Sequence, residues 1–224
     1  MTTPGGELGV GNATLFRSPF APADLGARHT AIWFGVNEQA EGCFLLSDPL
    51  APGAAAAMAS LRDAGLDLEL VSGDRHATTE WAAAELGIGA AQGDLSLEDK
   101  VALVRARQAD GGAIAFVGDG TNDALAMSEA SASIAVARAT DEALAASGFV
   151  LLGGKLGSLP ALFAIGRKLR RIVVENTLWA FAFNVAFVPV AAAGKLVPLA
   201  AMALMLVSST AVLLNSLRMR RAKP

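Results

Sequence analysis

Two long stretches without a charged residue constrain what this chain can fold into. They cover residues 176–194 and 196–217, and Lys195 alone separates them. About 20 apolar residues in a helix cross the hydrocarbon core of a bilayer, so each stretch is long enough to span a membrane. We therefore expect two transmembrane helices, at about residues 175–194 and 197–217, joined by a tight turn. The alternative is a hydrophobic helical hairpin buried in the core of a soluble protein.

The charges that flank the two stretches predict their orientation. Basic side chains lie before the first stretch and after the second. Since positive charge marks the cytoplasmic side of a membrane helix, we expect both termini in the cytoplasm, with lipid as a partner, in a bacterial inner or plasma membrane. The basic residues are Arg167, Lys168, Arg170 and Arg171 before the first stretch, and Arg218, Arg220, Arg221 and Lys223 after the second.

The net charge of -3 conceals two parts of opposite sign. Residues 1–165 hold 9 Lys/Arg and 20 Asp/Glu, whereas residues 166–224 hold 9 Lys/Arg and 1 Asp/Glu. The acidic part disfavours nucleic acid as a partner, because phosphate binding needs a basic face. The single cysteine, Cys43, excludes a disulfide framework and a multi-cysteine metal site. The sequence therefore predicts an acidic domain followed by a basic, apolar membrane segment.

The acidic part alternates short apolar runs with longer helix-forming runs. Such alternation predicts an α/β fold with a parallel sheet flanked by helices. Ligands of these sheets bind beyond the carboxyl ends of the strands. The expected strands are residues 31–36, 43–47, 68–72, 113–117, 133–136 and 150–152, of which the first two form a hairpin with its loop at 37–42. The expected helices are residues 54–64, 76–86, 97–108, 122–130 and 141–146.

Polar residues and glycines follow two of the expected strands, at the edge where a ligand would bind. Because the carboxyl ends of parallel strands meet at one edge of the sheet, we expect the two loops to form one site. The residues are Ser72, Gly73 and Asp74 after one strand, and Gly118, Asp119, Gly120, Asn122 and Asp123 after the next.

The residue types in these loops suit Mg²⁺ and phosphate. Asp119 and Asp123 bring together two hard oxygen ligands of the kind that Mg²⁺ prefers. Gly118 and Gly120 let the backbone approach a phosphate closely. An ordinary glycine- and aspartate-rich turn is the alternative interpretation of the same residues.

Two further groups are suited to holding a phosphoryl oxygen. Ser72 offers its hydroxyl and its backbone N–H, and Lys100 offers a positive charge. We expect Lys100 to be exposed on its amphipathic helix, together with Glu98. Taken alone, such a lysine is more often simply solvated, so its assignment depends on the two loops beside it.

Polar residues also lie inside the two membrane-length stretches. Asn184 occurs in the first, five residues before Pro189, whereas Met205, Ser208 and Ser209 occur in the second. Such residues either hold membrane helices together or line a transport pathway. Asn215 is open to the same two interpretations.

Four segments, in order and spacing, carry a resemblance to a known family. Residues 46–66 (LSDPLAPGAAAAMASLRDAGL), 68–88 (LELVSGDRHATTEWAAAELGI) and 117–137 (VGDGTNDALAMSEASASIAVA) resemble the phosphorylation domain of P-type ATPases, within the haloacid-dehalogenase-like superfamily. Residues 175–219 resemble the last two membrane helices of the heavy-metal (type IB) branch. The similarity covers roughly residues 30–221.

This resemblance implies a mechanism. An aspartate accepts the γ-phosphoryl group of ATP, and the aspartyl-phosphate drives a membrane site between inward- and outward-facing states. By the same resemblance Ser72, Gly73, Asp74, Lys100, Asp119, Asn122 and Asp123 are catalytic residues, Gly118 and Gly120 bind the phosphate, and Asp119 and Asp123 hold Mg²⁺.

The copper-exporting subgroup gives the most similar pattern. Its last helix carries a Met-x-x-Ser-Ser motif, which Met205, Ser208 and Ser209 match. Its preceding helix carries Tyr-Asn, where this chain has Phe183 and Asn184. The Met205 thioether is a soft ligand that suits Cu(I). The resemblance therefore implies Cu(I) as the transported heavy-metal ion, bound by Asn184, Met205, Ser208 and Ser209.

The chain lacks the Asp-Lys-Thr-Gly-Thr run that carries the nucleophile in this family. We expect residues 30–165 to be a phosphorylation domain without its nucleophile strand, residues 166–224 a membrane domain, and residues 1–29 the tail of a nucleotide-binding domain. The chain would then be inactive alone and would need an upstream ATPase polypeptide as partner. Whether it is an enzyme by itself stays open. The alternatives are a membrane-anchored phosphatase with Asp48 as nucleophile, and a non-enzymic relic or regulator.

Overall fold

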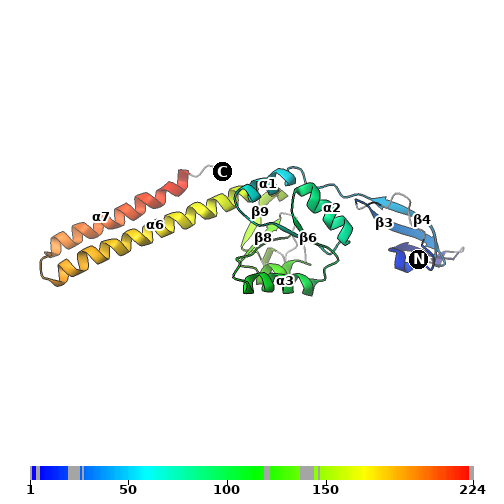
Figure 1. Ribbon diagram of the computed structural model, residues 1–224, viewed down its shortest axis with the longest axis horizontal. Coiled ribbons are helices and arrows are strands. Elements are labelled where there is room, and N and C mark those ends of the chain that lie inside the picture. The colour runs from blue at the N-terminus through cyan, green and yellow to red at the C-terminus, as the bar shows by residue number, and fades with distance from the viewer. Residues whose placement is uncertain are drawn as a thin grey trace. The chain divides into compact units, whose positions relative to one another are not determined.

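The computed structural model describes residues 2–3, 6–19, 26, 28–118, 122–136, 144–145 and 147–221. The chain divides into two compact units, residues 1–157 and 158–224. The first unit contains an antiparallel sheet and an α/β region, and the second is a helical hairpin (Figure 1). This architecture agrees with the predicted class, an α/β domain with parallel strands and flanking helices followed by two apolar helices.

The antiparallel sheet has the order β1-β2-β3-β4. Phe16, Ala31 and Trp33 form its small core. Asn37 and Glu38 both have positive φ, which is typical of a two-residue hairpin turn between β3 and β4. The strands are β1 (Thr2–Thr3), β2 (Gly6–Gly11), β3 (Thr30–Val36) and β4 (Gln39–Leu46), and a short helix, η1 (Ala13–Leu15), follows β2.

Two features of this sheet differ from the sequence-based expectation. The hairpin loop is two residues long instead of residues 37–42, because Asn37 and Glu38 adopt the left-handed conformation and β4 begins directly after them. The sheet also crosses the predicted boundary after residue 29, since β2 pairs with β3. The assignment of the two sides to separate domains stays a prediction.

The α/β region contains two groups of parallel strands, β5-β6 and β7-β8-β9. Among the described residues β5 and β7 are not paired with each other. Val71 of β5 nevertheless packs against the core that includes Phe116 of β7 and Val104 of α3, so one core supports both groups. The elements are α1 (Ala54–Asp63), β5 (Glu69–Val71), α2 (His76–Leu86), β6 (Ala90–Gln92), α3 (Leu97–Ala109), β7 (Ala115–Gly118), α4 (Ala124–Glu129), β8 (Ala132–Val136), β9 (Phe149–Leu151), η2 (Leu152–Gly154) and η3 (Leu156–Ser158).

Most of the expected helices and strands of this region are present, within a few residues at their ends. Strand β6 was not expected from the sequence. The helix expected at residues 141–146 falls largely outside the described residues, so it is neither confirmed nor contradicted.

Helix α3 begins with a capping box. The Ser96 side chain accepts a hydrogen bond from the Asp99 backbone N–H, and the Asp99 carboxylate accepts one from the Ser96 N–H. These bonds satisfy two of the backbone donors that every helix leaves free at its N-terminus. The cap therefore fixes where the first turn of α3, including Lys100, begins.

Replacing Ser96 with alanine is expected to destabilise the first unit by about 1 kcal/mol, the usual cost of losing such a cap. The Ser96 hydrogen bonds hold the pKa of Asp99 below its ordinary value. A carboxyl group whose pKa is lowered in the folded state stabilises the protein at pH values above the ordinary aspartate pKa. This contribution disappears as the pH falls through the lowered pKa. Denaturant titrations of both proteins should therefore show a difference in stability that shrinks in acid. A difference that grows in acid would contradict this interpretation of the cap.

The second unit consists of α6 (Leu159–Ala192) and α7 (Pro198–Ser216), followed by η4 (Leu217–Arg221). Both helices are long and apolar enough to cross a membrane. Gly194 has a positive φ in the turn between them, as expected for a glycine after a helix. Helix α6 begins well before the predicted span at about residue 175, because the basic residues ahead of that span are themselves good helix formers.

Polar side chains join the two helices at one end of the hairpin. The Asn215 amide donates hydrogen bonds to Asn176 and to Glu175, and the Asn176 amide donates one to Ser216. Arg218 also donates to the Glu175 carboxylate, at 3.1 Å. Of the two interpretations of Asn215, the structure therefore supports helix packing.

Candidate functional site

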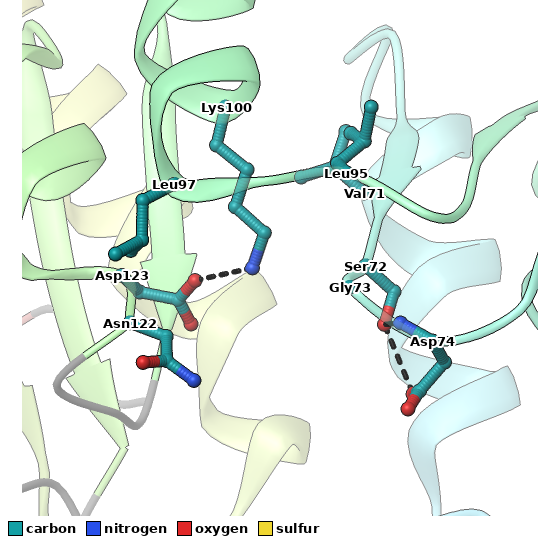
Figure 2. Close-up of a pocket in the computed structure, with 9 residues that line it drawn as sticks. All are labelled: Val71, Ser72, Gly73, Asp74, Leu95, Leu97, Lys100, Asn122 and Asp123. Carbon is teal, nitrogen blue, oxygen red and sulfur yellow. Dashed lines mark hydrogen bonds and ion pairs between the residues drawn. The ribbon is translucent and has the colours of Figure 1, made fainter. Parts of the chain in front are cut away.

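The polar loops of the α/β region line one cavity of about 550 Å³. Figure 2 shows the Lys100 side chain extending from α3 toward the space between Asp123 and the turn that follows β5. The carboxyl ends of β5 and β7 thus meet at the same cavity, as the rule for parallel sheets predicts. Its lining residues are Val71, Ser72, Gly73, Asp74, Leu95, Leu97, Lys100, Asn122 and Asp123.

Lys100 and Asp123 form a largely buried ion pair. The Lys100 Nζ lies 2.8 Å from Asp123 Oδ1, and the two side chains are only 10% and 16% exposed. Glu98 is exposed as expected, but the expectation that Lys100 is exposed is wrong. The cause is Asp123, the residue directly before α4, because its carboxylate pairs with the ammonium group.

Ser72 and Asp74 form a compact turn after β5. The Ser72 hydroxyl lies 3.0 Å from Asp74 Oδ2 and also accepts a hydrogen bond from the Asp74 backbone N–H. The Ser72 backbone N–H donates to the carbonyl of Gln92, at 3.0 Å. The expectation that this N–H is offered to a phosphate is therefore corrected, because pairing with β6 occupies it. The hydroxyl remains at the cavity wall.

The structure explains why residue 118 is a glycine differently from the sequence analysis. A Cβ atom at this position would lie 2.8 Å from both Cβ and Oδ2 of Asp123. Glycine at the end of β7 therefore lets Asp123 approach the strand, whereas we expected it to admit a phosphate. Asp119 and Gly120 lie outside the described residues, so their predicted roles stay predictions.

The described part of the cavity suits a magnesium ion held together with phosphate. Asp74 and Asp123 both contribute carboxylates to the wall, and Asn122 lies beside Asp123 (Figure 2). Mg²⁺ is commonly bound through one or two carboxylates, with phosphate oxygens and water filling the other positions. The described residues contain no group of three or more His, Cys, Asp or Glu side chains that could hold a metal without such a ligand.

Sequence reasoning did not include the apolar part of this wall. Val71, Leu95 and Leu97 line the cavity next to the polar groups. Leu95 lies in the connection after β6, and its backbone N–H donates to the carbonyl of Ser72. The sequence analysis missed these residues because it did not predict strand β6, which brings this connection beside Ser72. Asp48, the nucleophile of the phosphatase alternative, is not among the lining residues.

A second cavity, of about 270 Å³, lies in the helical hairpin. Asn184 on α6 lines it together with Met205, Ser208 and Ser209 on α7, so the four predicted ion-site residues share one cavity. Phe183 also lines it, and the centroids of the Phe183 and Phe187 rings are 4.6 Å apart. The remaining lining residues are Phe187, Val188, Ala191, Leu196, Ala201 and Leu204.

Comparisons with known proteins agree with both parts of this structure. The model of the haloacid dehalogenase-like hydrolase family matches residues 3–131. Cation-transporting P-type ATPase B of Mycobacterium tuberculosis is 39% identical over 191 residues, and probable copper-exporting P-type ATPase V of the same species is 37% identical over 192. The crystal structure of a zinc-transporting PIB-type ATPase in its E2.Pi state covers 95% of this chain and 36% of that chain, with a TM-score of 0.77 and 26% identity.

The family match over residues 3–131 establishes that this chain belongs to the haloacid dehalogenase-like hydrolase family. Within that family, its similarity is to the heavy-metal P-type ATPases, and it extends over both the α/β unit and the membrane-length helices. The two mycobacterial proteins match 85% and 86% of this chain, whereas the chain spans 25% of each of them. It thus corresponds to about a quarter of the length of these relatives.

Proposed function

We propose that this chain is the C-terminal part of a P-type ATPase that moves Cu(I) across a membrane, with both termini in the cytoplasm. In this proposal the α/β unit uses Mg²⁺ and ATP, and the hairpin binds the transported ion. The similarity to cation-transporting and copper-exporting ATPases supports the heavy-metal class.

In the α/β unit, we assign the phosphoryl group to the cavity between Ser72 and Lys100. The Ser72 hydroxyl and the Lys100 ammonium group stabilise the charge that develops on the phosphoryl oxygens. Asp123, with Asp119, would hold Mg²⁺, which would supply further positive charge beside the phosphate. Asp123 also orients Lys100 through their ion pair.

The observation that carries the choice of Cu(I) is the shared cavity of Met205, Ser208, Ser209 and Asn184. A thioether is a soft ligand and favours Cu(I) over harder divalent ions. Residues 196–217 contain no ionisable side chain that would instead favour zinc. The structural relative named above is a zinc-transporting ATPase, and its substrate is not transferred to this chain.

Replacing Met205 with leucine is expected to weaken Cu(I) binding about tenfold or more. Even the loss of a residue that only hydrogen-bonds to a metal ligand lowers metal affinity by about 10–100-fold. Met202 is the matched control, because it lies one turn earlier on α7, is also exposed, and does not line the cavity. The measurement titrates Cu(I) into the full chain in detergent against a chromophoric Cu(I) chelator. Equal weakening by Met202→Leu, or tighter binding of Zn²⁺ than of Cu(I), would refute the copper assignment.

A further inference from the structure

Helix α6 carries one exposed stripe that combines arginines with large apolar side chains. Its members are alternately four and three residues apart, a spacing that keeps side chains on one face of a helix. The four apolar members are between 48% and 70% exposed. A continuous exposed apolar surface usually marks a binding partner. In chain order, the stripe consists of Arg167, Arg171, Val174, Leu178, Phe181 and Val185.

The stripe faces away from α7. Phe183 and Phe187 line the cavity that the two helices share, and by helical geometry they lie about half a turn from the stripe. Ile172 lies on the same side as these two rings and is only 4% exposed. Within the described part of the hairpin, α7 therefore leaves the stripe uncovered.

The arginines of the stripe lie at the depth of the lipid headgroups when α6 spans a membrane. About 20 helical residues cross the hydrocarbon core, and counted back from Ala192 they reach about residue 173. Arg167 and Arg171 lie just outside this length, whereas Val174 and the later members lie within it. The stripe thus changes from basic to apolar where a bilayer changes from headgroups to hydrocarbon.

The basic end of the stripe carries excess positive charge. Glu175 is the only acidic residue of residues 166–224. Its carboxylate is shared between Arg171, at 2.9 Å, and Arg218, at 3.1 Å. Arg170 is exposed next to Arg167 and adds a further cation to this end. An anionic partner therefore suits the basic end, and an apolar partner suits the rest of the stripe.

We propose that this stripe binds an anionic phospholipid of the cytoplasmic leaflet. Arg167 and Arg170 bind the headgroup phosphate through charge-assisted hydrogen bonds. One acyl chain lies along Val174, Leu178 and Phe181. A zwitterionic headgroup is less favourable, because its ammonium group brings a like charge to the arginines. The site rests on the membrane insertion and orientation proposed above, and it does not depend on which ion the hairpin carries.

A lipid fits this stripe better than a second copy of the hairpin does. The only carboxylate of the hairpin, Glu175, is already paired, so a second copy offers no free anion to the arginines. Interfaces between membrane helices are also enriched in small residues, whereas the apolar members of the stripe are valines, a leucine and a phenylalanine. An anionic lipid supplies both the negative charge and the apolar chain in one molecule.

The test uses the full chain in nanodiscs of phosphatidylcholine with a minor share of phosphatidylglycerol. Phe181→Trp places a reporter on the stripe, and Trp179→Phe removes the native tryptophan of α6. The chain with Trp179→Phe alone gives the background of Trp33 and Trp81. Brominated acyl chains quench tryptophan at close range, so each lipid is brominated in turn. We expect the reporter to favour phosphatidylglycerol about fivefold for each arginine bound to the headgroup, the usual effect of a basic residue at a membrane surface.

Lys195→Gln is the matched control for the double variant Arg167→Gln with Arg170→Gln. Lys195 is an exposed cation of the same hairpin, but it lies in the turn between the helices. The double variant is expected to lower the preference about tenfold or more, and Lys195→Gln to leave it unchanged. Equal loss in both variants, or no preference before substitution, would overturn the proposal.

A further arm distinguishes a lipid from free phosphate. Inorganic phosphate is added to the nanodiscs and compared with sodium chloride at the same ionic strength, so that screening is equal in both. We expect the preference for phosphatidylglycerol to be the same in the two salts. A loss specific to phosphate would show an anion site without a lipid chain and would overturn the lipid assignment.

The quenching of Trp179 in the unsubstituted chain separates this inference from the proposed function. If brominated phosphatidylcholine quenches Trp179 but the reporter at position 181 shows no preference, the lipid site fails while membrane insertion stands. If Trp179 is quenched and neither lipid quenches the reporter, a protein surface covers the stripe and the proposal is overturned. If neither lipid quenches Trp179, the membrane part of the proposed function fails as well.

Discussion

The full chain carrying Lys100→Met is expected to be less stable by about 3 kcal/mol, because the substitution leaves the Asp123 carboxylate buried without its counter-ion. The two side chains are 10% and 16% exposed, so water compensates little for the lost ion pair. The measurement is a denaturant titration in detergent, followed by intrinsic tryptophan fluorescence. Lys155→Met is the control, since this lysine is exposed in the same unit and such a substitution is usually within about 0.5 kcal/mol.

A double substitution shows whether the ion pair is the cause. Lys100→Met combined with Asp123→Leu removes both charges, and the cost of the pair of changes is expected to be well below the sum of the single costs. If the two single effects simply add, the loss of stability arises from packing and not from an isolated charge. A further variant, Lys100→Arg, separates the shape of the cation from its charge, because it keeps the charge but changes the geometry of the side chain.

The second large effect is expected for Gly118→Ala, which should destabilise the first unit by about 2 kcal/mol. The added Cβ would lie 2.8 Å from Cβ and Oδ2 of Asp123, which is closer than such atoms approach. Asp123 has a short side chain and is held by Lys100, so its displacement breaks the ion pair.

Gly89→Ala is the matched control for this substitution. Gly89 lies in the same unit, and a Cβ atom there would meet nothing within 4 Å. Because Gly118→Ala and Lys100→Met disrupt the same ion pair, their combined effect should be smaller than the sum. Equal destabilisation by both alanine substitutions would show that the contact with Asp123 is not responsible.

Local chemistry made the ends of several elements predictable. Helix α2 begins and ends at the expected residues, 76 and 86, since Gly87 adopts a left-handed conformation directly after it. The turn of the hairpin follows from Gly194 and from Pro198, which has no N–H to lose at the first position of α7. These signals act within a few residues, so no knowledge of the tertiary fold is needed.

Other features depend on partners that are distant in the sequence. Strand β6 (Ala90–Gln92) contains no β-branched or aromatic residue, and it is extended because it pairs with β5. The burial of Lys100 depends on Asp123, 23 residues further on. The need for glycine at position 118 likewise comes from the close approach of the Asp123 side chain, which the sequence does not reveal.

The candidate site was predictable in its location and less so in its details. The rule for the carboxyl ends of parallel strands correctly joined the loops at Ser72 and Asp123. Their hydrogen bonds could not be anticipated, since Ser72 uses its backbone N–H for pairing with β6. In the hairpin, the motif of Met205 and the two serines identified these three residues, whereas the cavity that they share with Asn184 depends on the packing of the second helix.

The continuity of α6 has a mechanical consequence. Its 34 residues, at about 1.5 Å each, make a rod of about 51 Å, which exceeds the roughly 30 Å of a bilayer's hydrocarbon core. Asn184 lies on this rod before Pro189, the proline inside the helix. A twist imposed on the first turns of α6 therefore reaches Asn184 through unbroken backbone hydrogen bonds. A flexible loop in the same place would not transmit this rotation, whereas a continuous helix is stiff enough to do so.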